Sequence, residues 1–309
     1  MKLQKLNLEK PYVKNFKIWT GKKYRNIAEP IPILKKLLKG ENEKLLKIYE
    51  KKLKENKIEN IPQAYRKNHN VKTNAAIHKN NKYWYKFDFT KFFDSINLDS
   101  LDFILENIYE NYYEDKNIYY DYFINPKTGG LTQGSPTSGT LAGLLLIPFW
   151  IDLKKKLPNT KITQYSDDLC ISSNKKLDIK YLLKVIKKSL KENNLPCKIN
   201  KDKTKILTNQ ARRLTGVSCN NKNKTTLRRD DYRSYRAIFH ALNKSNNKIE
   251  TLYDLNLTPD EFIGRLSFFL YIDSTNKINK LIGKNIKTYK EIKKYQIKER
   301  ILIWNWENF

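Results

Sequence analysis

The sequence of 309 residues predicts an α+β protein, with an antiparallel sheet in its central part and helices towards its C-terminal end. Three observations indicate this class. Aromatic and polar residues alternate between residues 83 and 90, which is the period of a strand. Residues 161–164 and 169–172 are two β-prone segments around a short polar turn, the pattern of a hairpin. From residue 228 onwards, apolar residues recur at helical spacing.

The charge of the chain predicts a polyanionic partner. Lysine and arginine number 61 against 32 aspartates and glutamates, so the formal net charge is +29, far more than solubility requires. Because 39% of the residues are hydrophobic and 12% are aromatic, the chain is not a disordered basic tail, which would lack aromatic residues. The composition therefore predicts a folded protein that binds a polyanion.

Cysteine usage and hydropathy predict a cytoplasmic protein that does not span a membrane. Cys170, Cys197 and Cys219 lie far apart without zinc-site spacing, which suits a reducing compartment. The longest apolar run, residues 141–151, is about half of the roughly 20 residues that a membrane helix needs, and residues 1–10 contain no apolar leader segment. Binding to a membrane surface is the alternative for so basic a chain, but basic residues spread along the whole sequence suit a long groove better.

Basic helices and one strand are expected in the first part of the chain. Residues 31–57 carry leucines at helical spacing with lysines between them. In residues 83–90 the alternation places Asp88 on the face opposite the aromatic side chains, as in a half-buried strand. A second helical region is expected over residues 98–113.

An apolar helix is expected next, with Ser135 as its N-cap and Pro136 at its first helical position. Its apolar stretch runs to Trp150. Pro148 interrupts this stretch and predicts a kink, and the helix should end before Pro158.

Hairpins and capped helices are expected in the remainder. Residues 161–173 form a hairpin with two aspartates at its tip, and residues 181–191 form an amphipathic helix. A second hairpin is expected over residues 214–227, with residues 220–223 as its turn. A later helix should begin after Thr258 with a capping box.

Three carboxylates are candidates for a metal site. Asp88 lies in the first strand, and Asp167 and Asp168 lie at the hairpin tip. Phosphoryl transfer with two metal ions needs carboxylates from separate strands that meet around two Mg²⁺ ions, or Mn²⁺ as a substitute. Adjacent aspartates also occur by chance, as at Asp230-Asp231, where neighbouring arginines indicate surface ion pairs on a helix. Because Asp167-Asp168 has apolar, β-prone flanks, metal binding is the favoured interpretation there.

Several segments together resemble the motifs of reverse transcriptases. Motifs A, B and C are matched in order by Phe87-Asp88 through Phe92-Phe93-Asp94-Ser95-Ile96, by Gln133-Gly134-Ser135-Pro136-Thr137-Ser138, and by Tyr165-Ser166-Asp167-Asp168. Earlier, Arg25-Asn26-Ile27-Ala28-Glu29-Pro30 followed by Leu34-Lys35 resembles the fingers motif of the bacterial enzymes. Asn200 with Lys203-Thr204 resembles motif D.

Two further segments resemble signatures of retron reverse transcriptases. Asn74-Ala75-Ala76-Ile77-His78 matches the NAxxH element, and Leu214-Thr215-Gly216 approximates the VTG element. The resemblance runs from Tyr24 to the segment 264–268, which is most of the chain.

The chain departs from the pattern of these relatives at three places. Leu214 replaces the valine of VTG, and Ser166 stands where alanine is commoner. Gly139 and Gly143 stand in the motif B helix, where many bacterial relatives have a proline and later an asparagine. One turn apart, the two glycines leave a bare stripe, either for close approach of template and nucleotide or for tight helix packing.

The resemblance implies a right-hand polymerase, an RNA-directed DNA polymerase with fingers, palm and thumb. The fingers would comprise residues 1–84, with residues 97–130 returning to the fingers or palm. The palm, an antiparallel sheet plus helices, would comprise residues 85–227, and the helical thumb residues 228–309. In such an enzyme the aspartate trio carries the metal ions, a primer hydroxyl attacks the α-phosphate of a dNTP, and pyrophosphate leaves.

The resemblance also implies how the sugar and the triphosphate are held. Phe93 would stack under the sugar and exclude a ribose 2′-OH, with ordinary core packing as the alternative. Arg25 and Lys35 would hold the incoming triphosphate, and Arg66 or Lys67 would suit the same work. For each of these basic side chains, the alternative is that it is merely solvated.

Three more residues are implied in nucleotide binding and catalysis. Gln133 and Gly134 precede a helix N-terminus, where backbone donors and a flexible turn meet nucleotide or template. A plain turn is the alternative. Lys203 would assist the departure of pyrophosphate as a general acid.

Six residues are candidate RNA contacts: Asn74, His78, Thr215, Gly216, Arg233 and Arg236. Asn74 and His78 would share one helix face, and a buried, hydrogen-bonded histidine is the alternative. Arg233 and Arg236 alternate with tyrosines on a basic helix, where the arginines would follow phosphates and the tyrosines would pack inside.

The partners that the resemblance implies are a cognate non-coding RNA as template and primer, its DNA product, dNTPs and a retron effector protein, with no membrane. The setting would be an anti-phage defence system that makes a short RNA-linked DNA. The alternatives are another bacterial reverse transcriptase, an RNA-templated RNA polymerase in which Asp94 senses the ribose, and an inactive RNA-binding scaffold.

Overall fold

The computed structural model describes residues 5, 12–19, 24–208 and 212–307, without the side chains of residues 25–26 and 301–307. The chain divides into two compact units. Unit 1 comprises residues 1–74 and 81–208, and unit 2 comprises residues 75–80 and 209–309. In the described residues no helix is long and apolar enough to cross a membrane.

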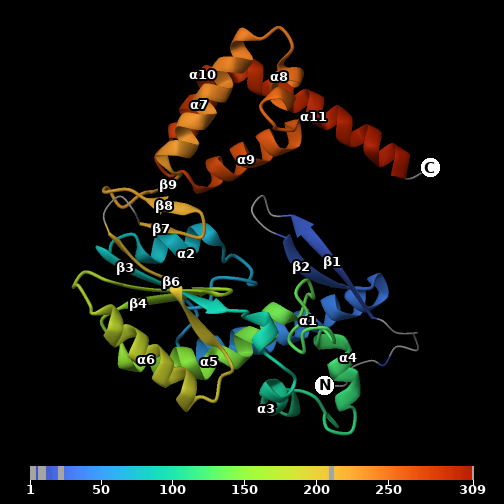
Figure 1. Ribbon diagram of the computed structural model, residues 1–309, viewed down its shortest axis with the longest axis vertical. Helices are drawn as coiled ribbons and strands as arrows, with labels where there is room; N and C mark the ends of the chain where they lie inside the picture. The colour runs from blue at the N-terminus through green and yellow to red at the C-terminus, as the bar shows by residue number, and fades with distance from the viewer. Residues whose placement is uncertain (1–4, 6–11, 20–23, 209–211, 308–309) are drawn as a thin grey trace. The chain divides into compact units, whose positions relative to one another are not determined.

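A four-stranded antiparallel sheet forms the centre of unit 1 (Figure 1). Its strand order is β4-β5-β3-β6, with β3 (Tyr83–Thr90), β4 (Lys161–Tyr165), β5 (Asp168–Ser173) and β6 (Lys198–Thr208). Both the expected strand and the expected acidic hairpin are confirmed. Phe87 and Phe89 face the core, as the alternation predicts. The expectation of a half-buried strand is wrong, because Trp84 on the Asp88 face is also fully buried.

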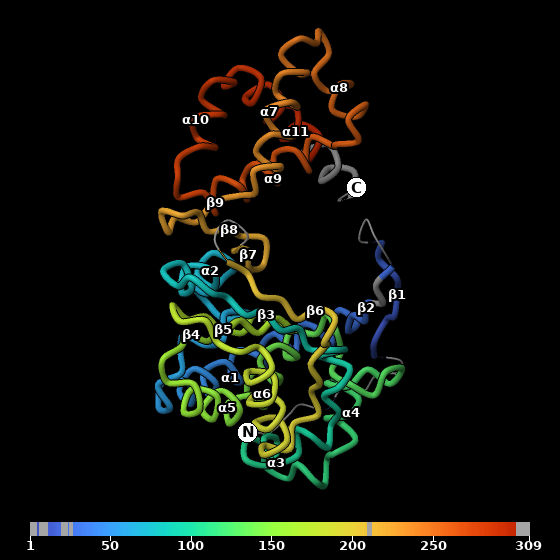
Figure 2. The backbone as a smooth tube through the Cα atoms, turned by 60° about the vertical axis from the view of Figure 1, so that its left-hand side comes forward, coloured from blue at the N-terminus to red at the C-terminus, as the bar shows by residue number. Residues whose placement is uncertain are grey.

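Long helices cover the aromatic face of this sheet. In both views α1 (Pro32–Glu55), α5 (Ser138–Lys156) and α6 (Ile179–Glu192) lie on the same side of it (Figures 1 and 2). The segment 31–57, expected as basic helices, is one helix whose leucines are buried at helical spacing. Burial of this apolar stripe against α5 is what stabilises α1, since its exposed face is rich in lysine.

The apolar helix α5 begins two residues later than expected, at Ser138 with Thr137 as its N-cap. Two bonds to the carbonyl of Thr132 explain the difference. The Ser135 amide donates to it at 3.1 Å, and the Ser138 hydroxyl donates to it at 2.7 Å. These bonds hold the preceding residues in a turn, so Ser135 cannot cap the helix. Pro148 lies inside α5, and the helix ends before Pro158, as expected.

The helix expected over residues 98–113 is wrong, because the segment breaks into short pieces. These are η2 (Asp99–Leu101), α3 (Asp102–Glu106) and turns that lead to α4 (Lys116–Phe123). The Asn107 amide donates to the carbonyl of Phe103 at 2.6 Å, which is a local bond that competes with helix propagation. Before α1, the strands β1 (Val13–Trp19) and β2 (Tyr24–Pro30) pair as an antiparallel hairpin.

Unit 2 combines a small sheet with a helical bundle. The sheet is β7-β8-β9, made of β7 (Arg213–Leu214), β8 (Val217–Cys219) and β9 (Thr225–Thr226). The helices are α7 (Arg229–Lys244), α8 (Lys248–Asp254), α9 (Pro259–Ile272), α10 (Lys277–Lys284) and α11 (Ile286–Glu307). The capping box at Thr258 is confirmed, and Tyr235 stacks on Phe262 in the core with ring centroids 5.6 Å apart.

Candidate active site

The three predicted carboxylates lie at the ends of neighbouring strands of the central sheet. Asp88 on β3 lies directly opposite Asp168 on β5 in the antiparallel register. Asp167 belongs to the two-residue turn between β4 and β5, and its carbonyl accepts the amide of Phe89 at 2.9 Å. Side chains that are 79 or 80 positions apart in sequence are thereby brought onto adjacent strand ends. The fold thus places the three candidate carboxylates on neighbouring strand ends, which the two-metal hypothesis requires.

A bulge in β6 brings Lys203 to this cluster. The ladder between β3 and β6 shifts so that Lys86 pairs with Lys205, whereas Asp88, two residues on, pairs with Asn200. The extra residues of β6 leave the ladder, and the Nζ atom of Lys203 lies 3.0 Å from both carboxylate oxygens of Asp88. Bulges redirect side chains next to active sites in this way. The motif D lysine therefore belongs to the acidic cluster.

A second lysine, not singled out from the sequence, also lies at the cluster. The Nζ atom of Lys86 lies 2.9 Å from Asp168 Oδ1, in a diagonal pair across β3 and β5. The side chains of Lys86 and Asp168 are 26% and 18% exposed, so water screens this pair only in part. The position of Lys86, two residues before Asp88 on the same strand face, is the signal that could have identified it.

The surroundings of Asp167 disfavour the ionised form of its carboxyl group. Burial raises the pKa of its carboxyl above the ordinary value of 3.8, and the neighbouring charges of Asp168 and Asp88 raise it further. Lys203 acts in the opposite direction and lowers the pKa of Asp167. A carboxylate that burial and like charge destabilise gains from any cation placed beside it.

The donor set fits divalent metal ions, although lysines hold two of its members. Within the described residues, no three His, Cys, Asp or Glu side chains form a group arranged to hold a metal ion. Asp88, Asp167 and Asp168 nevertheless offer carboxylate oxygens alone, which are the ligands that hard cations prefer. The ammonium groups of Lys203 and Lys86 place positive charge at the oxygens of Asp88 and Asp168.

The residues predicted around the nucleotide lie in the same unit. Phe93 begins the turn η1 (Phe93–Ser95), half-buried, with its ring centroid 5.1 Å from that of Phe92. The side-chain amide of Gln133 donates to Asp94 Oδ1 at 3.0 Å, and the backbone carbonyl of Gln133 accepts the backbone amide of Ala28 at 3.1 Å. Gly134 has φ +111°, and an added Cβ would lie 2.5 Å from the carbonyl oxygen of Ala28. Only glycine suits that position.

The predicted triphosphate ligands have different surroundings. Lys35 pairs with Glu29, which lowers the pKa of that glutamate. Arg25 lies in β2, and its side chain falls outside the described part of the chain. Arg66 is buried and forms two bonds to Glu50, at 2.7 and 2.6 Å, so a role in triphosphate binding is wrong for Arg66 in this arrangement. Lys67 is exposed.

The NAxxH pair is buried. Asn74 and His78 lie on α2 (Val71–His78), and both residues have no exposed surface. Asn74 Oδ1 accepts the hydroxyl of Thr163 on β4 at 2.6 Å. A direct contact of either side chain with RNA is therefore wrong for this conformation, because an RNA ligand reaches only exposed groups. The alternative, a buried polar pair that fixes the helix, is the better interpretation.

Thr215 and Gly216 form the tight turn between β7 and β8. Leu214 pairs with Val217, and the two residues between them have φ values of +44° and +88°. Positive φ at both central positions is the signature of a type I′ hairpin turn, for which glycine is favoured at the second position. The LTG element thus forms a hairpin turn that was not expected. The predicted turn at residues 220–223 follows it.

Arg233 and Arg236 are exposed on α7 and line a groove of about 1100 Å³ in unit 2. The lining of this basic groove includes one acidic residue, Asp230, and eight bases: Arg213, Lys222, Lys224, Arg228, Arg229, Arg233, Arg236 and Lys277. Arg228 pairs with Asp230 at 3.0 Å, as expected for a surface ion pair. Tyr235 is in the core, whereas Tyr232 lines the groove.

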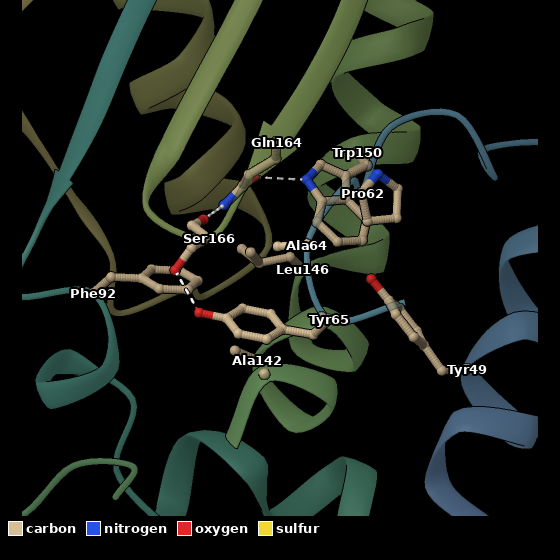
Figure 3. A pocket seen from close by; sticks show the side chains of 12 residues that line it. Tyr49, Pro62, Ala64, Tyr65, Phe92, Ala142, Leu146, Trp150, Gln164 and Ser166 are labelled. Atoms are coloured by element: carbon tan, nitrogen blue, oxygen red, sulfur yellow. Dashed lines mark hydrogen bonds between the residues drawn. The ribbon is translucent and has the colours of Figure 1, made fainter. Parts of the chain in front are cut away.

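The two glycines of α5 serve packing. A Cβ on Gly139 would lie 2.3 Å from the ring of Tyr65, and one on Gly143 would lie 2.5 Å from the hydroxyl oxygen of Tyr49. Real Cβ atoms do not approach other atoms so closely. Of the two explanations that the sequence leaves open, the structure supports tight packing, and two tyrosines fill the bare stripe (Figure 3).

The comparisons with known proteins agree with this geometry. Residues 20–251, about three quarters of the chain, match the family described as reverse transcriptase (RNA-dependent DNA polymerase). The chain is 32% identical over 167 residues to the retron Ec73 reverse transcriptase of Escherichia coli, covering 48% of this chain and 51% of that protein. The expected resemblance to retron reverse transcriptases is thus confirmed, and the chain spans about half the length of the curated relative it matches.

Solved structures with a similar course of the chain include two yeast telomerases. Telomerase from Candida albicans, in complex with a TWJ fragment of telomeric RNA, matches with a TM-score of 0.49 and 13% identity, over 91% of this chain and 59% of that one. Apo telomerase from Candida tropicalis matches with a TM-score of 0.48 and 14% identity, over 91% and 62%. On the extent of the family match, this chain belongs to the reverse transcriptase family and has its right-hand polymerase fold.

Proposed function

We propose that this chain is an RNA-directed DNA polymerase that extends a primer hydroxyl with dNTPs on an RNA template. The observation that carries the proposal is the convergence of Asp88, Asp167 and Asp168 on neighbouring strand ends of a reverse transcriptase chain. Phosphoryl transfer needs positioned charge and no covalent side-chain nucleophile, and this cluster offers the positioned charge.

The three carboxylates would hold two Mg²⁺ ions, with Mn²⁺ as a substitute. Such ions, when bound, polarise phosphate oxygens and stabilise the charge that develops on them. Lys203 would give its ammonium proton to the leaving pyrophosphate, which its contact with Asp88 and its 58% exposed side chain support. Phe93 would limit the space at the sugar, and the Gln133 amide, held by Asp94, would face nucleotide or template.

The division of the hand follows from the resemblance and not from the two compact units, whose boundary lies at residues 208 and 209. We place the fingers in residues 1–84, with residues 97–130 returning to them or to the palm. The palm spans residues 85–227 and the thumb residues 228–309. The basic groove of unit 2 supports RNA binding by the last part of the chain, because its one acidic residue is outnumbered by lysines and arginines. Arg233 and Arg236 would follow phosphates there, and Thr215 and Gly216 would add RNA contacts from the same unit.

The retron setting is the finer part of the proposal. The NAxxH and LTG elements and the similarity to the retron Ec73 enzyme support a cognate structured RNA that is copied into an RNA-linked single-stranded DNA. An effector protein and a role in anti-phage defence would follow from that setting. Sequencing of the nucleic acid that co-purifies with the protein tests it, and a branched RNA-DNA molecule is the expected product.

Primer extension on an RNA template tests the activity itself. The intact protein should incorporate dNTPs with Mg²⁺, and Asp167→Asn should lose more than about 100-fold in rate, because one of the charge-stabilising groups is removed. Asp254→Asn is the matched control, since this aspartate is exposed at the end of α8. Equal rates for Asp167→Asn and the control would refute the assignment.

An inactive RNA-binding scaffold is the second candidate. The lysine pairs at Asp88 and Asp168 favour it, because a carboxylate neutralised by lysine needs no metal ion. A wild-type protein that binds RNA yet extends no primer with either Mg²⁺ or Mn²⁺ would support the scaffold and refute the polymerase.

A further inference from the structure

Tyr65 is an aromatic residue in an unusual backbone conformation beside the acidic cluster. It lies between α1 and α2 with φ +59°, a left-handed conformation that bulky residues rarely adopt. Its ring lies against Gly139 of α5, where an added Cβ would come within 2.3–2.8 Å of ring carbons. Backbone strain of this kind is retained when the surrounding structure fixes it, and it gathers at functional sites.

The hydroxyl of Tyr65 reaches the acidic turn. It donates to the hydroxyl oxygen of Ser166 at 3.0 Å, across 101 positions of sequence (Figure 3). Ser166 immediately precedes Asp167 and also has a left-handed backbone, with φ +56°. Its carbonyl accepts the side-chain amide of Gln164 at 2.9 Å. The turn that carries Asp167 is thus held by two side chains, one from β4 and one from the loop of Tyr65.

The ring of Tyr65 reaches a second functional candidate. Its centroid lies 6.1 Å from that of Phe93 at an interplanar angle of 67°, an edge-to-face contact. The cavity beneath the ring has a volume of only about 20 Å³, the room of roughly one water molecule, so the ring has little space to sink. Tyr65 is 52% exposed, but desolvation of its hydroxyl still raises the pKa of Tyr65, so the hydroxyl stays protonated and able to donate.

We propose that Tyr65 is a positioning residue that links the acidic turn to the sugar-facing Phe93. Its hydroxyl fixes Ser166, and with it the carboxylate of Asp167, while its ring fixes the plane of Phe93. The proposal rests on the polymerase function proposed above. A serine in the acidic turn, where relatives more often have alanine, supplies the acceptor that makes the link.

The two contacts predict separable effects. Tyr65→Phe removes only the hydroxyl, and Ser166→Ala removes only its acceptor. Each should lower kcat for dNTP incorporation about two- to tenfold, the loss expected for one hydrogen bond, with little change in KM. Because the two substitutions break the same bond, the double variant should be no slower than either single variant. Tyr65→Leu removes the edge contact as well and should admit ribonucleotides about tenfold more readily than Tyr65→Phe.

The test is primer extension with dNTPs and with ribonucleotides on the full chain, together with urea unfolding of each variant. Tyr113→Phe is the control, because this exposed tyrosine bonds Glu106 and contacts Tyr112, neither of which belongs to the acidic turn. Additive losses in the double variant, unchanged kcat, or a Tyr65→Leu variant that is less stable but equally selective would each overturn the link. An active wild type in those cases leaves the polymerase proposal standing, whereas an inactive wild type overturns both.

Discussion

Alanine at Gly143 tests whether this glycine exists for packing. Its added Cβ would lie 2.5 Å from the hydroxyl oxygen of Tyr49, 2.6 Å from Cζ and 3.1 Å from Cε1. Tyr49 is 2% exposed on α1 and its ring also contacts Trp150, so the side chain cannot swing away cheaply. Overpacking of a core at this level costs about 1–3 kcal/mol.

The helix propensity of alanine partly conceals that cost, because alanine stabilises a helix interior by about 1 kcal/mol relative to glycine. Gly40→Ala is therefore the matched control. Gly40 lies inside α1, and an added Cβ meets no heavy atom within 4 Å. The free energy of unfolding of Gly40→Ala should be about 0.5–1 kcal/mol higher than that of the wild type. The difference between the two alanine variants therefore isolates the effect of packing.

Urea unfolding of both variants and the wild type gives the free energies of unfolding. We expect Gly143→Ala to be about 1–3 kcal/mol less stable than Gly40→Ala. Tyr49→Phe should recover part of this loss in the Gly143→Ala background, because it removes the nearest clashing atom. Equal stability of the two alanine variants would refute the close contact. Loss of activity without loss of stability would restore the interpretation that Gly143 makes room for template.

Three further predictions concern charge. Asp167→Asn should unfold at higher urea than wild type at pH 7, and the difference should vanish below about pH 3.8. The reason is that a folded-state pKa above the ordinary value of 3.8 means that stability falls as pH rises through the interval between them. A higher midpoint for wild type at pH 7 would contradict this. Arg66→Lys should cost about 1–3 kcal/mol in urea unfolding, since lysine cannot reproduce the two bonds to Glu50; Lys67→Arg is its control. Arg236→Gln should reduce the slope of log affinity for RNA against log salt by about 1, whereas Lys188→Gln on α6 should not.

Local sequence pattern was sufficient for the elements whose signals are short in range. The alternation in residues 83–90 defines β3 with the expected bounds, and the hairpin pattern in residues 161–173 defines β4 and β5 to within one residue at each end. Cap chemistry located α9 as well. It misplaced the start of α5, because Thr132, outside the capping pattern, binds both Ser135 and Ser138. The N-cap residue depends on which acceptor the donors near the helix start bind. Sequence spacing alone does not show which acceptors compete for these donors.

The candidate site divides in the same way. The identity of the three aspartates follows from motif order, whereas their neighbours depend on tertiary contacts. Tyr65 reaches Ser166 across 101 positions, and Lys203 reaches Asp88 only because β6 bulges opposite it. The periodicity of the sequence predicts neither a β-bulge nor a loop that packs against a glycine of a helix.

Two lysines reduce the repulsion between the carboxylates of the acidic cluster. Lys203 and Lys86 neutralise Asp88 and Asp168, while Asp167 keeps a raised pKa and no lysine partner among the ion pairs of the described residues. Lys203 is the more exposed of the two lysines, at 58% against 26%, whereas its partner Asp88 is more buried than Asp168, at 10% against 18%. Under the proposed function, these carboxylates would hold metal ions in place of lysine contacts, so both ion pairs would weaken. Because Lys203 is also the proposed general acid, metal binding and proton supply would then depend on the same side chain.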